Sequence, residues 1–212
     1  MSLRMALLLA VASVLGGGAA LAQSTAENNF ASIYLNDDKI GQVHFVVRNG
    51  ASGEVDRVTV HASVSVFGIQ VADYLQTLHE DWRGAQIQRL SARSSNGDDT
   101  TLVEVTRAAA GLQGSVNGQP VSLPATAFPA SPWHFAITQQ NVLFAPTDLQ
   151  LMNVQVASTP DQVMIAGQTV AATRYDFTGD WTASVWFDAQ TRLVQAQFDV
   201  NGHTVQIRAD AD

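Results

Sequence analysis

The residues most able to do chemistry in this sequence stand together at positions 79–83, where His79, Glu80, Asp81, Trp82 and Arg83 follow one another. They supply an acid, a base and a cation, which are the groups that general acid–base catalysis uses. On a pleated strand, however, adjacent side chains point to opposite faces, so His79 and Glu80 are poorly placed to work as a pair. Glu80 and Trp82 do share a face. The stretch predicts a strand that enters a tight hairpin in a large antiparallel sheet.

Glu80 and Trp82 allow two interpretations. In the structural one, the chain turns at residues 83–85, Trp82 packs on the sheet, and Arg89, Arg93 or a neighbouring strand satisfies Glu80. Cross-strand pairs of this kind are common in sheets, which favours this interpretation. In the functional one, Glu80 and Trp82 line a ligand site on the concave side of the sheet.

Other catalytic or metal-binding patterns are not found in the sequence. The five histidines are scattered and lack the close spacing of a compact metal motif. There is no Cys, no G-x-S-x-G nucleophile motif, and residues 96–99 lack the ligand spacing of a calcium loop. We therefore predict no catalytic residue, no metal and no cofactor.

The first 22 residues have the features of a secretory signal peptide. Arg4 supplies the positive start, an apolar run follows, and Ala20-Leu21-Ala22 is a small-x-small cleavage site before Gln23. A membrane anchor needs about 20 strongly apolar residues, and Gly16, Gly17 and Gly18 interrupt a shorter run here. The sequence thus predicts a cleaved segment 1–22, a mature chain 23–212 in the periplasm or outside the cell, and no remaining transmembrane anchor.

Length and charge limit the class of protein. The mature chain fits one domain, since all-β domains often reach about 200–250 residues. With 11 basic and 19 acidic residues the net charge is −8, which disfavours nucleic acids and anionic membrane surfaces as partners. The composition identifies no protein partner.

Period-two alternation is the main structural signal. In residues 57–68, Val58, Val60, Ala62, Val64 and Val66 share one face, as in a half-buried antiparallel strand. The same alternation returns at both ends of the chain, where short turns leave no room for crossover helices. Near the carboxyl end it predicts a shared face for Val194, Ala196, Phe198 and Val200. Hairpin turns are predicted at residues 36–38, 96–97, 117–118 and 201–202. The interpretation is an all-β domain with a single large curved antiparallel sheet, a half-barrel or open barrel.

The middle of the chain differs. Residues 124–146 contain four prolines, which lack a donor for a sheet ladder. This Pro-rich connection is predicted to be long and irregular, with at most one short helix, from about Ser131 to Gln139.

Aromatic residues suggest that both faces of the sheet are covered or used. Trp181 and Trp186 have opposite parity on one predicted strand, so they must lie on opposite faces. Either the Pro-rich connection covers such rings, as aromatic side chains mostly serve as core material, or an apolar surface is left for a ligand.

Several motifs resemble an uncharacterised family of secreted bacterial proteins, domain of unknown function 6134. They are Ile40-Gly41, a Glu-x-Trp strand with a Gly turn and a Leu-Ser-Ala-Arg segment (Glu80, Trp82, Gly84 and residues 90–93), and a Pro-x-x-x-Trp element (Pro129 and Trp133). Where that family often has a second aromatic, this chain has His134. The resemblance implies an all-β fold similar to the half-barrels of lipoprotein-localisation proteins, and it implies no known activity.

The leading functional hypothesis is non-catalytic binding of an apolar or amphiphilic ligand, a lipid or an envelope component, in the concavity. Its apolar wall would be Trp82, Trp133, Phe135 and Trp181, with Glu80 and Arg93 as polar anchors. Two alternatives remain open. One is an envelope assembly or scaffold protein that uses a sheet edge or an aromatic patch, and the other is an enzyme with Glu80 as acid or base.

Overall fold

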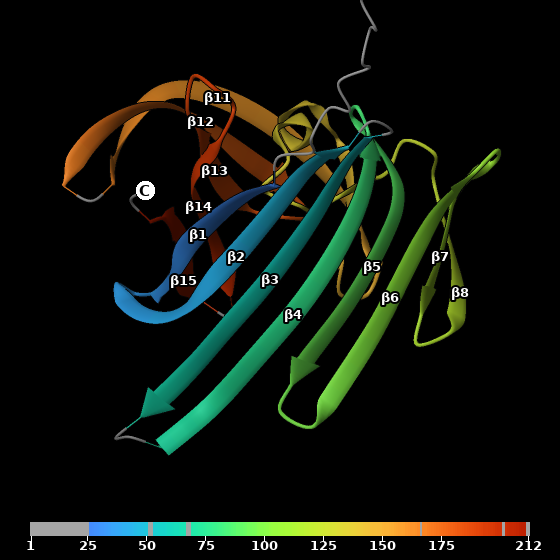
Figure 1. Ribbon diagram of the computed structural model, residues 1–212, viewed down its shortest axis with the longest axis horizontal. Helices are drawn as coiled ribbons and strands as arrows, with labels where there is room; N and C mark the ends of the chain where they lie inside the picture. The colour runs from blue at the N-terminus through green and yellow to red at the C-terminus, as the bar shows by residue number, and fades with distance from the viewer. Residues whose placement is uncertain (1–25, 51–52, 67–68, 166, 201, 211–212) are drawn as a thin grey trace, which may run out of the picture.

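The computed structural model describes residues 26–50, 53–66, 69–165, 167–200 and 202–210. The predicted signal peptide lies outside these residues. The described chain forms 15 strands and one short 3-10 helix, η1 (Figure 1). The first eight strands are β1 (Ala26–Leu35), β2 (Asp38–Gly50), β3 (Gly53–Val66), β4 (Ile69–Arg83), β5 (Gln86–Asn96), β6 (Asp99–Ala108), β7 (Gly111–Val116) and β8 (Gln119–Leu123). The others are β9 (Phe128–Pro129), β10 (Val142–Phe144), β11 (Leu151–Ile165), β12 (Gln168–Gly179), β13 (Ala183–Phe187), β14 (Leu193–Val200) and β15 (His203–Ala209), with η1 at Phe135–Gln139.

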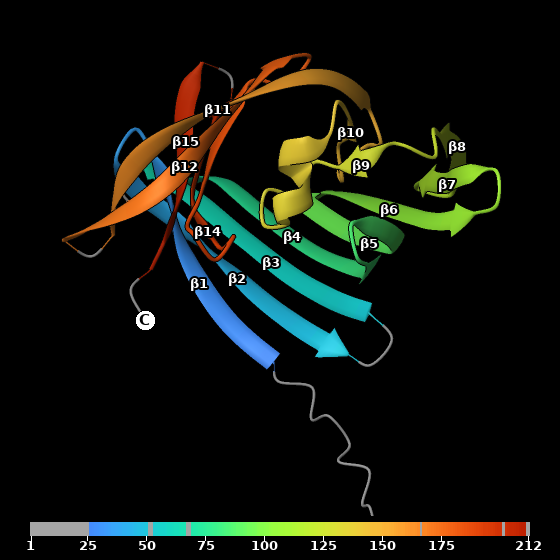
Figure 2. The same cartoon turned by 90° about the horizontal axis from the view of Figure 1, so that it is seen from above.

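The strands follow one hydrogen-bonded order, from β8 down to β1, then β15 down to β9. Strands that are consecutive in sequence therefore pair, except β8 and β9, and the antiparallel contact of β1 with β15 joins the two halves. The β9–β10 pair is parallel, an exception to the antiparallel pattern. The sheet curls but stays open, with β8 and β9 at its two ends (Figure 2). The predicted curved, open all-β sheet is confirmed.

Hairpin turns lie where the sequence predicts them. Asn36 and Asp37 have φ of 47° and 75°, and Asn117 and Gly118 have 50° and 80°. Two successive positive φ angles are typical of type I′ turns, whose twist matches that of paired strands. The turn after Arg83 and the turn after Asn96 are also present. Residues 67–68 and Asn201 lie outside the described residues.

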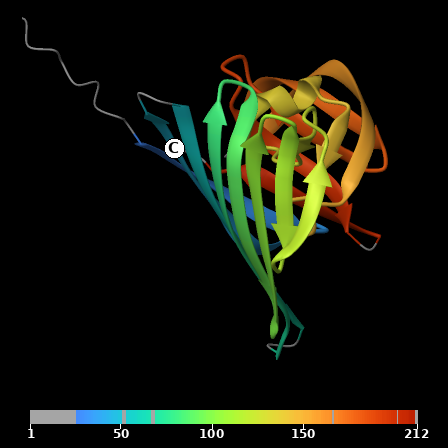
Figure 3. The same cartoon turned by 90° about the vertical axis from the view of Figure 1, so that its right-hand side faces the viewer.

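The Pro-rich connection lies inside the curve of the sheet, between β1–β8 on one side and β11–β15 on the other (Figures 2 and 3). Its one short helix is η1, within the predicted range. The connection is more regular than predicted, because it also contributes β9 and β10. Pro129 is tolerated in β9 because that strand is two residues long and ends the sheet.

The two faces of the sheet bury different cores. The inner face carries Leu78, Leu90, Val103 and Phe177 and packs against the connection in one large core. On the outer face, Trp186 packs with Val163 and Val194 in a second, small core that we call the outer tryptophan cluster. The opposite placement of Trp181 and Trp186 is thereby confirmed.

One predicted face is wrong. The alternation of β14 places Val194 with Ala196 and Phe198, but Val194 belongs to the outer tryptophan cluster. A register irregularity between Trp186 and Phe187 inserts an extra residue opposite that step, and such a bulge turns one side chain to the other face.

The described residues contain no helix long and apolar enough to cross a membrane.

Candidate functional site

Register places the predicted site residue Glu80 at the centre of the inner face. Glu80 lies opposite Asp56 of β3 and Leu90 of β5. Leu78, Glu80 and Trp82 are all buried, as expected for alternate residues of one strand facing the core. The predicted shared face of Glu80 and Trp82 is therefore observed, although a register irregularity lies between Asp81 and Trp82.

The Glu80 carboxylate is fully buried, with 0% of the residue exposed. Its Oε2 accepts hydrogen bonds from the indole Nε1 of Trp82, at 3.2 Å, and of Trp133, at 3.0 Å. Its Oε1 accepts a hydrogen bond from the Ser131 hydroxyl. We call these four residues the buried carboxylate cluster. An ionised carboxylate away from water needs several donors, and here three come from neutral side chains.

Two of the three donors come from the Pro-rich connection. The chain turns at residues 129–134, where the Ser131 N–H donates to the Pro129 carbonyl at 2.7 Å and the His134 N–H donates to the Ser131 carbonyl at 3.2 Å. This turn brings the side chains of Ser131 and Trp133 to the same carboxylate. Glu80 thus fastens the connection to the sheet.

Ring packing reinforces this attachment. The His134 ring lies 4.1 Å from the Trp82 ring, centroid to centroid, and the Phe128 ring lies 4.9 Å from it. His134 Nδ1 also accepts a hydrogen bond from the Ala136 N–H at 3.2 Å, at the start of η1. The imidazole of His134 therefore packs as an aromatic ring against Trp82 and Phe128.

The expected arginine partners of Glu80 are on the wrong face. Glu80 is opposite Leu90, and Arg89 and Arg93 lie one and three residues from Leu90, so both point outward and are exposed. Hence the two arginine partners that the structural interpretation names are wrong. Ser131 is the residue that sequence reasoning missed. It lies between the flagged Pro129 and Trp133, but only the tertiary fold brings it to Glu80.

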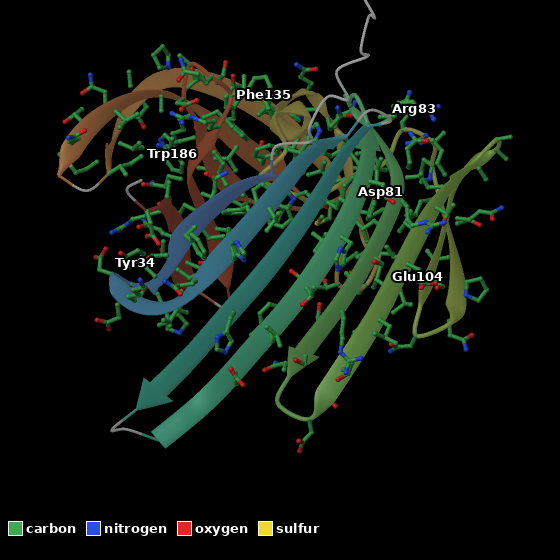
Figure 4. All side chains as sticks on the ribbon, in the orientation of Figure 1. Tyr34, Asp81, Arg83, Glu104, Phe135 and Trp186 are labelled. Carbon is green, nitrogen blue, oxygen red and sulfur yellow. The ribbon has the colours of Figure 1, made fainter. Side chains whose placement is uncertain are left out.

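The other predicted wall residues lie on the concave side and are partly covered. Phe135 in η1 packs edge-on against Phe187, at 5.1 Å, and against Tyr175, at 5.9 Å. Trp181 precedes β13 and packs on Phe177 at 5.3 Å. Phe135 and Trp133 belong to the connection, whereas Trp181 lies in the turn between β12 and β13. Figure 4 shows Phe135 beside η1 and away from Asp81 and Glu104.

A second indole–carboxylate contact lies on the outer face. Trp186 Nε1 donates to Asp161 Oδ2 at 2.8 Å, and the Arg174 guanidinium lies 5.4 Å from the Trp186 ring centroid. The hydrogen bond from Trp186, a backbone hydrogen bond from Gln162 and the positive charge of Arg174 lower the pKa of Asp161. This contact holds the β11–β12 hairpin against β13 and β14.

The burial of Glu80 and the spacing of acidic and histidine side chains bear on what chemistry these sites could support. Glu80 has no exposed surface in this conformation, and its oxygens accept hydrogen bonds from the protein itself. Within the described ranges, no three His, Asp or Glu side chains are grouped so that they could hold a metal ion. The fold and the site define a β-barrel-like protein whose interior is occupied by its own connection, held by a buried carboxylate.

Comparison with known proteins gives the family. Residues 32–210 match the model described as Domain of unknown function (DUF6134), and the chain belongs to this family. Among solved structures, it is similar to a beta-barrel-like protein of domain of unknown function DUF1849 from Brucella abortus. The TM-score is 0.60 at 11% identity, over 87% of this chain and 95% of that one. At that identity the similarity supports the fold alone. A search of curated proteins gives no match.

Proposed function

We propose that the protein binds an apolar or amphiphilic small molecule on its concave side, beside the Pro-rich connection, without catalysis. The observation that carries the proposal is a set of aromatic rings on the inner face that the core covers only in part. They are Trp133, Phe135, Tyr175, Trp181 and Phe198. Partly exposed aromatic side chains on a concave surface are typical of sites for apolar ligands.

The buried carboxylate cluster has a positioning role in this proposal. The bond from Trp133 Nε1 to Glu80 fixes one edge of the indole and leaves part of its ring uncovered. Trp82 is buried beneath the connection, so it supports the wall rather than touching the ligand. Arg93 is on the outer face and takes no part.

Glu80 is not assigned as an acid or base. A working general acid or base must come within hydrogen-bond reach of the substrate, and the donors around Glu80 belong to the protein itself. This arrangement favours binding over the enzymatic alternative.

Export is part of the proposal, because an envelope lipid or a similar molecule would be met outside the cytoplasm. It rests on the signal-peptide features of residues 1–22. We expect protein recovered from its own host to begin at Gln23, and the intact mass will show this. A full-length mass with Met1 retained would contradict export by cleavage.

The test of binding uses 1-N-phenylnaphthylamine, an uncharged apolar dye whose fluorescence rises in apolar sites. Phe135→Ala and Trp181→Ala should each weaken dye binding by about tenfold, the loss expected when a buried aromatic contact is removed. Leu102→Ala is the matched control, because Leu102 is 47% exposed on the outer face of β6. Unchanged dye affinity in both folded aromatic variants would overturn the proposal.

Native mass spectrometry provides a second test. Protein purified without detergent should carry a reproducible adduct that organic extraction releases. The Trp181→Ala protein should carry less of it than the Leu102→Ala protein.

A further inference from the structure

The inner face changes from apolar to polar along its strands. Across the sheet, one row of paired residues joins Phe45, through Val58, to Leu78, Ala92 and Val103, and it is apolar throughout. The next row joins Val43, through Val60, to Gln76, Ser94 and Thr101. On β4, β5 and β6 the polarity therefore changes between two adjacent rows.

The third row continues the polar region with Tyr74 and Asn96, which are paired. Gln76 and Ser94 are each only 8% exposed, and the Gln76 side-chain amide donates to the Ser94 hydroxyl at 3.1 Å. We call Tyr74, Gln76, Ser94, Asn96 and Thr101 the neutral polar end. Its amides and hydroxyls can both donate and accept hydrogen bonds.

Tyr74 is the one member of the neutral polar end with a titratable side chain. Burial raises the pKa of Tyr74, although a hydrogen bond with Ser94 acts in the opposite direction. The Tyr74 hydroxyl therefore stays protonated well above neutral pH.

Charged side chains on this part of the inner face are few. Among the described residues of β4, β5 and β6 that face inward, they are Glu80, Arg107 and Asp99. Glu80 is sealed in its cluster. The Arg107 guanidinium donates to the carbonyls of Ile87 and Ala125 near the opposite end of the strands. Asp99 is exposed beside the hairpin turn and disfavours an anion.

The apolar row meets the proposed ligand wall. The Phe45 ring lies 5.9 Å from the Trp133 ring, and Gln76 is two residues beyond Leu78, or about 7 Å along the strand. Gln76 is on β4, two strands across from Phe45 on β2, so a ligand that reaches from Trp133 and Phe45 across β3 to β4 would place its head beside Gln76.

We propose that the ligand is an amphiphile with an uncharged, hydrogen-bonding headgroup, held at the neutral polar end, while its tail lies along the aromatic wall. This inference rests on the proposed function. Among the described inward-facing residues of β4, β5 and β6, no cation lies at this end to pair with a carboxylate or phosphate headgroup, and the net charge of −8 would oppose such a headgroup further.

The experiment displaces bound 1-N-phenylnaphthylamine with four amphiphiles that share a 14-carbon tail. They are monomyristoylglycerol, myristate, myristoyl-lysophosphatidylcholine and tetradecyltrimethylammonium. Monomyristoylglycerol should displace the dye at a concentration about tenfold lower than the three charged or zwitterionic compounds. Equal displacement by all four would leave the proposed function standing and overturn the headgroup assignment.

Variants locate the headgroup. Tyr74→Phe and Ser94→Ala should each weaken the binding of monomyristoylglycerol by about threefold to tenfold, as expected for one lost hydrogen bond. Neither change should alter binding of the dye. Tyr34→Phe is the control, because Tyr34 is opposite Gln206 on the outer face, where the Arg208 guanidinium lies 4.5 Å from its ring. If both folded variants keep the wild-type preference for the uncharged headgroup, the inference is overturned. If neither the dye nor any of the four amphiphiles binds the wild-type protein, the proposed function is overturned as well.

Discussion

The molecule uses the same chemical contact on the two faces of its sheet, an indole N–H donating to a carboxylate. On the inner face, Trp82 and Trp133 donate to Glu80, which has no exposed surface. On the outer face, Trp186 donates to Asp161, which is exposed. Both contacts hold a distant segment of chain against the sheet.

The two contacts differ in their access to water. If the outer contact is broken, water can hydrogen-bond to Asp161. If the inner contact is broken, buried donors and a buried carboxylate lose their partners with no water to replace them, and such groups are costly to leave unpaired. The same pair of groups should therefore stabilise the fold much more at Glu80 than at Asp161.

The largest effect is expected for Glu80→Leu. This change leaves the buried N–H and O–H groups of Trp82, Trp133 and Ser131 without their acceptor, which should lower the free energy of unfolding by about 3–5 kcal/mol. Urea denaturation will measure it. Glu104→Leu is the control, because Glu104 is exposed on the outer face (Figure 4), and it should change stability by no more than about 0.5 kcal/mol. Similar values for the two variants would contradict the role given to Glu80.

A matched pair of tryptophan variants compares the two faces directly. Trp133→Phe keeps an aromatic ring but removes the donor to buried Glu80, and should cost about 1–3 kcal/mol, the range for leaving a buried hydrogen-bonding group without its partner. Trp186→Phe removes the equivalent donor to exposed Asp161 and should cost clearly less. Thermal and urea unfolding of both proteins, run together, will give the order. The reverse order would show that the outer contact is the stronger one.

The smallest expected effect is the contribution of Asp161 to the pH dependence of stability. The pKa of Asp161 is lowered in the folded protein, chiefly by the Trp186 hydrogen bond, so the folded state holds that proton less well than the unfolded state. The resulting stabilisation is complete above the ordinary aspartate pKa, about 4, and is lost as pH falls through the lower folded value.

Comparing wild type with Asp161→Asn will isolate this contribution. The difference in unfolding free energy should be constant from about pH 7 to pH 5 and should shrink below about pH 4. Asp180, whose pKa is lowered by hydrogen bonds from Asn153, remains in both proteins and cancels in the comparison. A difference that persists unchanged in strong acid would contradict the assignment.

Much of the fold was predictable because it depends on local signals. Alternation identifies strands, and Asn and Gly at two-residue turns identify hairpins, since few residues adopt the positive φ that these turns need. Val194 shows the limit of this approach. Alternation assumes an unbroken register, and a bulge opposite Trp186 moves Val194 to the other face.

The candidate site was predictable only in part. The shared face of Glu80 and Trp82 follows from their spacing, and the sequence singles out Trp133. That Glu80 is bound by Ser131 and Trp133 could not be predicted, because 51 and 53 residues separate them and no local pattern reports such a contact. Arg93 appeared a suitable partner by charge, but parity places it on the outer face.

The amino-acid sequence by itself determined the all-β class, the positions of the hairpins and, where no bulge intervenes, which residues of a strand share a face, because turn conformation and side-chain alternation are properties of neighbouring residues. Only the tertiary structure decided which segment fills the inside of the curved sheet and which donors satisfy Glu80. Those outcomes depend on how far the sheet curls before β1 meets β15 and on where the Pro-rich connection then packs. They are set by long-range packing, which no short stretch of sequence encodes.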